Sequence, residues 1–170
     1  MSFDPPDVTL RSVRPDDIAV LAAMLARPEV ARWWPGYGDR ARVEREFLGD
    51  EPDLTIYAIE VGGRLAGSIQ SFEEAEADFR HANIDLFVDP DLHGRGIGSA
   101  AIRRLAAILI DEKGHHRLTI DPAADNKVAI RVYEKVGFRP VGRMRQYQRM
   151  ADGTWADGLL MELLAGDLVR

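Results

Sequence analysis

The stretch Asp89-Pro90-Asp91-Leu92-His93-Gly94-Arg95-Gly96-Ile97-Gly98 lies between an alternating segment and a long amphipathic one. We predict a strand over His81–Val88, a glycine-rich loop, and a helix from about Ile97 to Asp111. Glycines let the backbone approach a ligand closely, and the free N–H groups at a helix N-terminus attract anions. The loop therefore predicts a pyrophosphate site, with a simple glycine-rich connection as the alternative. It lacks the Gly-Lys-Ser/Thr ending of a P-loop and the glycine spacing of a dinucleotide fingerprint, which excludes both motifs.

Interleaved strands and helices are predicted on both sides of this loop. The expected strands are Val8–Val13, Leu54–Val61, Arg64–Phe72, Arg117–Ile120, Phe138–Met150 and Trp155–Leu164, and the expected helices are Asp16–Ala26, Asp39–Leu48 and Asn126–Val136. Gly62-Gly63 supplies a hairpin turn, and Gly137 ends a helix. Because the elements do not alternate strictly, we expect an α/β fold with a mixed sheet covered on both faces. No repeat or linker interrupts the chain, so residues 1–170 are expected to form one domain.

Composition narrows the class of protein. The chain has 170 residues, 46% of them hydrophobic, with 28 acidic side chains against 22 Lys and Arg and a net charge of −6. This charge argues against a nucleic-acid partner and suits a cationic ligand better. The absence of Cys excludes disulfides and a thiolate nucleophile, and the four His residues have no metal-ligand spacing, so no metal is predicted.

The chain shows no targeting or membrane signal. Its first residues lack the basic and apolar regions of a secretory signal, and its longest apolar run, Ile18–Ala26, is far shorter than the ~20 residues that span a bilayer. We therefore expect a cytoplasmic protein without a membrane partner.

Acidic residues concentrate in one part of the chain. Between Asp50 and Asp91, eleven acidic residues stand against two basic ones, Arg64 and Arg80. Glu73, Glu74, Glu76 and Asp78 dominate this stretch, which is either a solvated loop or part of the site for a cation.

Two motifs in this order resemble those of the GNAT acyl-CoA-dependent N-acetyltransferases. The loop is similar to that family's Gln/Arg-x-x-Gly-x-Gly motif, except that His93 replaces Gln or Arg, and the second motif runs from Asn126 to Phe138. The likeness extends from about Val8 to Leu163. It implies a single-domain, mostly antiparallel mixed sheet that is splayed at the acyl-CoA site. It also implies acetyl-CoA as co-substrate.

Within this family the chain most resembles the aminoglycoside 6′-N-acetyltransferases. The resemblance rests on Val30-Ala31-Arg32-Trp33-Trp34, on Gln70-Ser71 in the third predicted strand, on Ile84-Asp85-Leu86, on Thr119-Ile120-Asp121-Pro122, and on the Asp152-Gly153 turn. It implies a small polycationic amine as acceptor. Adjacent tryptophans also occur in related siderophore and lysine acyltransferases. The acidic stretch after Phe72 departs from the pattern, because the related enzymes have aromatic residues there.

The resemblance assigns the acetyl-CoA contacts to the loop, to the neighbouring strand and to the last predicted helix. The strand backbone would pair with the pantetheine amides, as a peptide-like ligand adds to a strand. The expected contacts are Phe87, Val88, His93, Gly94, Arg95, Gly96, Ile97, Gly98, Ser99, Asn126, Ala129 and Tyr133.

Two side chains are the catalytic candidates. Alternation places Asp85 on the strand face opposite Ile84 and Leu86, where it would receive the amine proton or anchor the amine. Tyr133 shares a helix stripe with Asn126 and Ala129, and its phenol would protonate the CoA thiolate. The alternatives are a solvent-facing carboxylate at the strand end and a packing tyrosine.

The acceptor contacts implied by the resemblance are Trp33, Trp34, Gln70, Ser71, Asp85, Asp121 and Asp152. Several carboxylates suit a polycation, because each ammonium gains a charge-assisted hydrogen bond. Asp121 and Asp152 would otherwise stabilise local turns, since Asp-Pro and Asp-Gly are turn dipeptides. The tryptophans either stack on sugar rings or fill the core.

Two other functions remain open at this stage. One is acetylation of another class of amine, such as a protein N-terminus, a polyamine or a siderophore precursor. The chain would otherwise be a non-catalytic acyl-CoA-binding module, although such a module needs neither Asp85 nor Tyr133. A monomer or a homodimer paired through the exposed terminal strand is expected.

Overall fold

The computed structural model describes residues 6–170, which form one seven-stranded sheet in the order β1-β2-β3-β4-β5-β7-β6. All neighbouring strands run antiparallel except β4 and β5, which are parallel. This mixed, mostly antiparallel sheet confirms the predicted fold class. The strands are β1 Val8–Ser12, β2 Leu54–Val61, β3 Arg64–Glu74, β4 His81–Val88, β5 Arg117–Ile120, β6 Arg139–Arg149 and β7 Trp155–Leu164.

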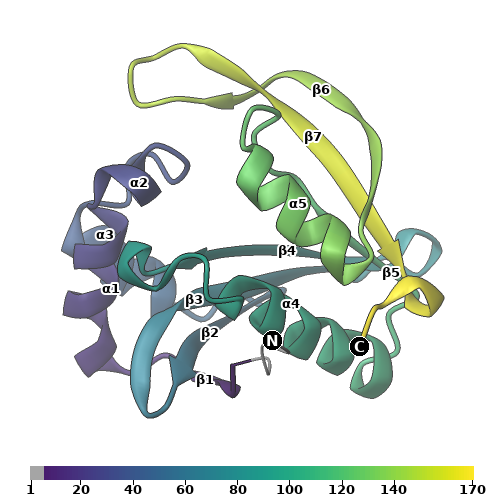
Figure 1. The fold of residues 1–170 in the computed structure, drawn as a ribbon, viewed down its shortest axis with the longest axis horizontal. Helices are drawn as coiled ribbons and strands as arrows, with labels where there is room; N and C mark the ends of the chain where they lie inside the picture. The colour runs from purple at the N-terminus through teal and green to yellow at the C-terminus, as the bar shows by residue number, and fades with distance from the viewer. Residues whose placement is uncertain (1–5) are drawn as a thin grey trace.

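Helices cover both faces of the sheet (Figure 1). One face packs against α4 and α5, and the aliphatic side chains between them form the larger core. The other packs against α1 to α3, with Phe87 of β4 in their common cluster. The helices are α1 Ile18–Leu25, α2 Pro28–Ala31, α3 Arg40–Phe47, α4 Ile97–Ala107 and α5 Lys127–Val136. No helix in this described part of the chain is long and apolar enough to cross a membrane.

The sheet opens between β4 and β5. These strands pair only at Ala82 with Leu118 and at Asn83 with Thr119, although β4 continues to Val88. Figure 1 shows α5 and the β6–β7 hairpin on one side of this opening and β4 on the other. The splayed sheet implied by the family resemblance is therefore present at the expected strand.

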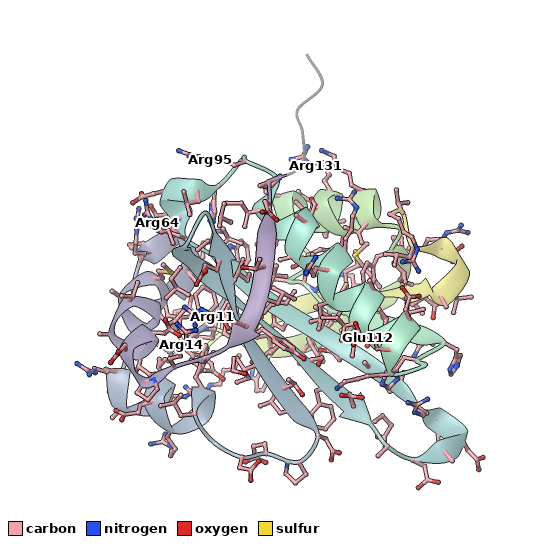
Figure 2. The ribbon with its side chains drawn as sticks, turned by 90° about the horizontal axis from the view of Figure 1, so that it is seen from below. Arg11, Arg14, Arg64, Arg95, Glu112 and Arg131 are labelled. Atoms are coloured by element: carbon pink, nitrogen blue, oxygen red, sulfur yellow. The ribbon has the colours of Figure 1, made fainter. Side chains whose placement is uncertain are left out.

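The start of α1 is tied to the sheet by Arg11. Its guanidinium donates to both carboxylate oxygens of Asp17, at 2.7 and 3.0 Å, and to Glu60 at 2.8 Å. Figure 2 shows Arg11 and Arg14 where β1 leads into this helical segment. The hydrogen bond from Arg11 lowers the pKa of Asp17. This junction fixes α1, and hence the segment that carries the two tryptophans.

The acidic stretch is only partly a solvated loop. β3 continues two residues beyond the predicted end at Phe72, and Glu73 binds the Lys113 ammonium and the buried His115, whose Nε2 lies 2.7 Å from Glu73 Oε2. Glu76 and Asp78 are exposed, as the solvated-loop interpretation requires. The short helix α2 and the π-helical turn Ile108–Glu112 at the end of α4 were not predicted.

Candidate active site

A cleft of about 880 Å³ lies at the opening of the sheet. Four separate parts of the chain line it: the α2 segment, β4 with the loop into α4, the β5–α5 connection with α5, and β6. Of the predicted site residues, the cleft brings together Trp33, Trp34, Asp85, Phe87, Val88, His93, Gly94, Gly96, Ile97, Gly98, Ser99, Asp121, Asn126, Ala129 and Tyr133. Their convergence follows from the splay, because the divergence of β5 from β4 leaves room between the two strands.

The α4 end of the cleft is built mainly from backbone. Gly94 and Gly96 have φ of +76° and +78°, in the left-handed region that disfavours residues with a Cβ, and Gly96 is the N-cap of α4. A Cβ at Gly98 would lie 3.9 Å from Leu86, Val88 and Val132 side chains, so the helix start packs closely on β4 and α5. The N–H groups in the first turn of this eleven-residue helix are of the kind that can receive an anion.

The free edge of β4 presents backbone groups to the cleft. The Asp89 N–H donates to Ala66 on β3, and backbone groups alternate in direction along a strand. The backbone N–H and C=O groups of Leu86 and Val88 therefore face the opening, whereas those of Phe87 face β3. This corrects the expectation that Phe87 pairs with a ligand through its main chain. His93 Nε2 donates to the Val88 carbonyl at 2.9 Å, and the Leu86 N–H donates to Asp85 at 2.8 Å.

Helix α5 contributes Asn126, Ala129 and Tyr133 to the same wall. Asn126 is the N-cap, and its Oδ1 accepts from the Ala129 N–H at 3.2 Å. Its NH2 group is thus the part of the side chain that a ligand would use. Tyr133 is buried against Phe138, with ring centroids 6.4 Å apart. Burial raises the pKa of Tyr133 well above its usual range, and the charges of Asp85 and Asp121 raise it further.

Asp85 is the most perturbed carboxyl group of the cleft. Burial raises its pKa to about 7, and the nearby charge of Asp121 acts in the same direction. The hydrogen bond from the Leu86 N–H opposes them without cancelling the effect. A carboxyl group that titrates near neutral pH exchanges protons readily under physiological conditions.

Asp121 is held in place by two donors. Tyr147 donates its phenolic hydrogen to Asp121 Oδ2 at 2.9 Å, and Asn83 Nδ2 lies 3.4 Å from the same oxygen. Asn83 also donates to Thr119 Oγ1 at 3.2 Å. Burial and the bond to Asp121 raise the pKa of Tyr147 to about 12, so the phenol stays protonated and keeps donating.

The two tryptophans have different surroundings. Trp34 makes edge-to-face contacts with Tyr37 and Phe87, at centroid distances of 5.3 and 5.4 Å, and packs against the core cluster of α1 to α3. The guanidinium of Arg32 lies 4.2 Å above the Trp33 ring, and the Trp33 carbonyl accepts from Gln148 Nε2 at 3.0 Å. One tryptophan is therefore largely a packing residue, and the other belongs to the cleft rim.

Four predicted site residues do not line the cleft. Ser71 is buried on the α4 face of the sheet, opposite to that of Asp85, and Gln70 pairs with Asp85 on the neighbouring strand without reaching the cleft. The carboxylate of Asp152 accepts from the N–H and the hydroxyl of Thr154 and so stabilises the hairpin turn. This is the alternative role predicted for Asp152. Arg95 is exposed on the loop before α4, and Figure 2 shows it at the same edge of the molecule as Arg131 of α5.

The sequence analysis did not indicate Tyr147, Gln148, Arg32 and Arg149, which line the cleft, or Asn83, which contacts Asp121 behind it. Asn83 has a signal, because it lies two residues before Asp85 and so shares its strand face. Tyr147 and Gln148 have none of this kind. They reach the cleft because the pairing of β6 with β7 shifts between Met144 and Gln148.

The described residues contain no cluster of three or more His, Asp or Glu that could hold a metal ion. The site chemistry available from the chain is thus an anion-binding helix start, a free strand edge, two carboxyl groups and two phenols.

Comparisons with known proteins identify relatives with this architecture. The family model described as an acetyltransferase (GNAT) domain matches residues 7–139. An aminoglycoside N(6′)-acetyltransferase type 1 from Klebsiella pneumoniae is 30% identical over 151 residues, which cover 79% of this chain and 75% of the relative. The solved structure of the aminoglycoside acetyltransferase AAC(6′)-Ib with coenzyme A has a TM-score of 0.77 and 27% identity, covering 95% of this chain and 96% of that one. A spermidine N-acetyltransferase from Vibrio cholerae, solved with CoA and spermine, has a TM-score of 0.79 at 18% identity, covering 94% and 96% of the two chains.

Proposed function

The chain belongs to the GNAT acetyltransferase family, and from this premise we propose that it transfers an acetyl group from acetyl-CoA to the 6′-amine of an aminoglycoside. The observation that carries the proposal is that Asp85 and Asp121 share one cleft with the glycine-rich start of α4. The 30% identity to a relative named for this activity supports the choice of acceptor. Two carboxylates close to the acetyl group that is to be transferred suit an acceptor with several ammonium groups.

The residues around the α4 start fit an acyl-CoA. Gly94 and Gly96 open the backbone toward the cleft, and the helix N-terminus suits a pyrophosphate. The cleft-facing groups of Leu86 and Val88 suit the amides of a pantetheine arm, once His93 releases the Val88 carbonyl. Acetyl-CoA supplies the acetyl group as an activated thioester. Arg95 and Arg131, exposed at the same edge, are placed to attract its phosphates (Figure 2).

Asp85 is the proposed base. An amine is nucleophilic only when neutral, and a carboxylate that titrates near pH 7 accepts its proton close to the working pH. Asp121, fixed by Tyr147 and Asn83, binds an ammonium group of the acceptor and favours its approach. Trp33 offers its ring at the rim, where a sugar ring would stack.

Tyr133 is the proposed acid. Its raised pKa keeps the phenol protonated at neutral pH, so it holds a proton that it can give to the departing thiolate. Tyr133 lies on the cleft wall and is buried, one helical turn after Ile130 in the core. This position on α5 keeps its hydroxyl away from bulk water.

An amine that also carries an anionic group is the second candidate acceptor. Arg32 and Arg149 line the same cleft and would meet the carboxylate or carbonyls of a peptide. This observation favours a peptide or amino-acid amine over a simple polyamine, which has no group for the two arginines.

Release of the CoA thiol by the purified protein tests both candidates. The panel contains acetyl-CoA with kanamycin, its 6′-hydroxyl analogue, spermidine, lysine or a short peptide. We expect rapid release with kanamycin and none with the 6′-hydroxyl analogue. Turnover with the peptide alone would favour the second candidate over the aminoglycoside. No release of the CoA thiol with any amine would contradict the proposed acceptor classes.

A further inference from the structure

Asp157 of β7 stands out as a polar residue outside the cleft with contacts directed to its walls. Its carboxylate accepts from the Gln146 N–H at 2.8 Å and from Arg143 Nε at 2.7 Å, both on β6. Its backbone carbonyl accepts from the Ala124 N–H at 2.8 Å, in the connection that follows Asp121. One residue thus joins the β6 irregularity to the connection between β5 and α5.

Gln146 is the residue that this carboxylate holds. Its φ of +49° is the one positive value at a non-glycine position in the described part of the chain. Such a conformation is costly for a residue with a Cβ and persists only where other contacts hold it. The position is exposed, so core packing does not supply those contacts, whereas the bond from Gln146 N–H to Asp157 does.

The left-handed residue decides where the next two side chains point. It lies within the pairing shift between Met144 and Gln148, and a strand irregularity of this kind changes the direction of the side chains beside it. Tyr147 then reaches Asp121, at 2.9 Å, and Gln148 reaches the carbonyl of Trp33, at 3.0 Å. Gly158 leaves room for this arrangement, since a Cβ there would lie 2.7 Å from the Tyr147 ring.

From these contacts we propose that Asp157 is a positioning residue for the acceptor half of the site. Its carboxylate holds Gln146 in the left-handed conformation, so that Tyr147 orients Asp121 and Gln148 joins β6 to the tryptophan segment. The inference rests on the proposed function only in assigning Asp121 to the acceptor. The carboxylate acts through β6 and touches neither the cleft nor the reacting groups.

Substitution of Asp157 with a matched rescue tests this role. In Asp157→Ala the KM for kanamycin should rise about tenfold, because the left-handed conformation of Gln146 is then less populated by about that factor. The KM for acetyl-CoA should stay unchanged. The double variant Asp157→Ala with Gln146→Gly should recover to within about threefold, because glycine adopts this conformation freely. Asp167→Ala is the control, since it removes a similar Asp–Arg pair with Arg139 at the other end of β6.

A readout independent of the acceptor separates this proposal from the proposed function. The chain contains four tyrosines, so 3-fluorotyrosine labelling gives four 19F resonances, and Tyr147→Phe identifies that of Tyr147. This resonance should move in Asp157→Ala, because the phenol loses its hydrogen bond to Asp121, and should return in the double variant. An unmoved resonance, or a shift that Gln146→Gly does not reverse, overturns the positioning role even if kanamycin is acetylated.

A second variant covers the case in which Asp157→Ala does not fold. Gln146→Pro removes the donor N–H and forbids a positive φ at an exposed position. It should displace the Tyr147 resonance to the same extent and raise the KM of the acceptor without changing that of acetyl-CoA. A resonance that stays in place in this variant contradicts the proposal.

Discussion

The two halves of the cleft are built in different ways. The half around α4 uses backbone groups of one continuous stretch, Gly94 to Ser99, together with the adjacent edge of β4. The other half uses side chains from segments far apart in the chain, which include Trp33, Asp85, Asp121 and Tyr147. A backbone site depends on local conformation and is less sensitive to the identity of its side chains. A side-chain site depends on tertiary structure, and replacing any one of its residues removes that residue's contact.

The largest effect is expected from removing the charge of Asp85. Asp85→Asn should lower kcat/KM for kanamycin by at least about a hundredfold, the usual contribution of a general base, without changing the KM for acetyl-CoA. Steady-state kinetics with each substrate varied in turn measures the split. Asp78→Asn, an exposed carboxylate between β3 and β4, is the control. An equal loss for both substrates would show that the two halves are not separable.

The tryptophan pair provides the next test, because one member serves the core and the other the rim. Trp34→Ala should lower the free energy of unfolding by about 2 kcal/mol, less than for a fully buried aromatic residue, since Trp34 packs against Tyr37 and Phe87 but is partly exposed. Trp33→Ala should leave stability nearly unchanged and raise the KM for kanamycin. Urea denaturation and kinetics on the two variants measure the difference, and equal loss of stability would contradict it.

The backbone half is tested by adding one methyl group. Gly96→Ala places a Cβ on a left-handed residue, where its nearest neighbour, Pro6 Cδ at 3.7 Å, is in ordinary van der Waals contact, so the substitution acts mainly through backbone strain. The KM for acetyl-CoA should rise about tenfold. The acceptor KM should not change. Gly142→Ala, on β6 with nothing near its Cβ and an ordinary φ, is the matched control.

The two halves also differ in what the sequence could predict. The glycine-rich loop, the Asn126 motif and the strand with Asp85 are local patterns, and the structure places all three as expected. The splay between β4 and β5 was available only through the family resemblance, because no local pattern indicates where two strands part.

The rest of the side-chain half of the cleft could not be predicted from the sequence, for physical reasons. Tyr147 reaches Asp121 through a shift in strand pairing that involves a left-handed glutamine, a residue with no marked preference for that conformation. Ser71 failed as a prediction because strand alternation turns it to the α4 face, and Asp152 because its nearest donors belong to its own turn. Position on a motif does not determine direction of a side chain.

The smallest expected effect is on thermal stability. Burial and Asp121 raise the pKa of Asp85 to about 7 from its ordinary 3.8, so between these values the folded chain binds a proton that the unfolded chain has released. Stability from this group is therefore full below about pH 4 and is lost as pH rises to 7. Asp85→Asn should raise Tm by a few degrees at pH 8 and not at pH 4. An equal shift at both pH values would contradict this linkage.

The pH dependence of kcat/KM for the acceptor, measured on the wild-type protein and on Asp85→Asn together, tests the central claim most directly. If Asp85 receives the amine proton, the wild-type profile falls below about pH 7 as the carboxylate becomes protonated. The variant should keep a low rate without that limb near pH 7. A limb near pH 7 of the same shape in both proteins would contradict the assignment of the base to Asp85.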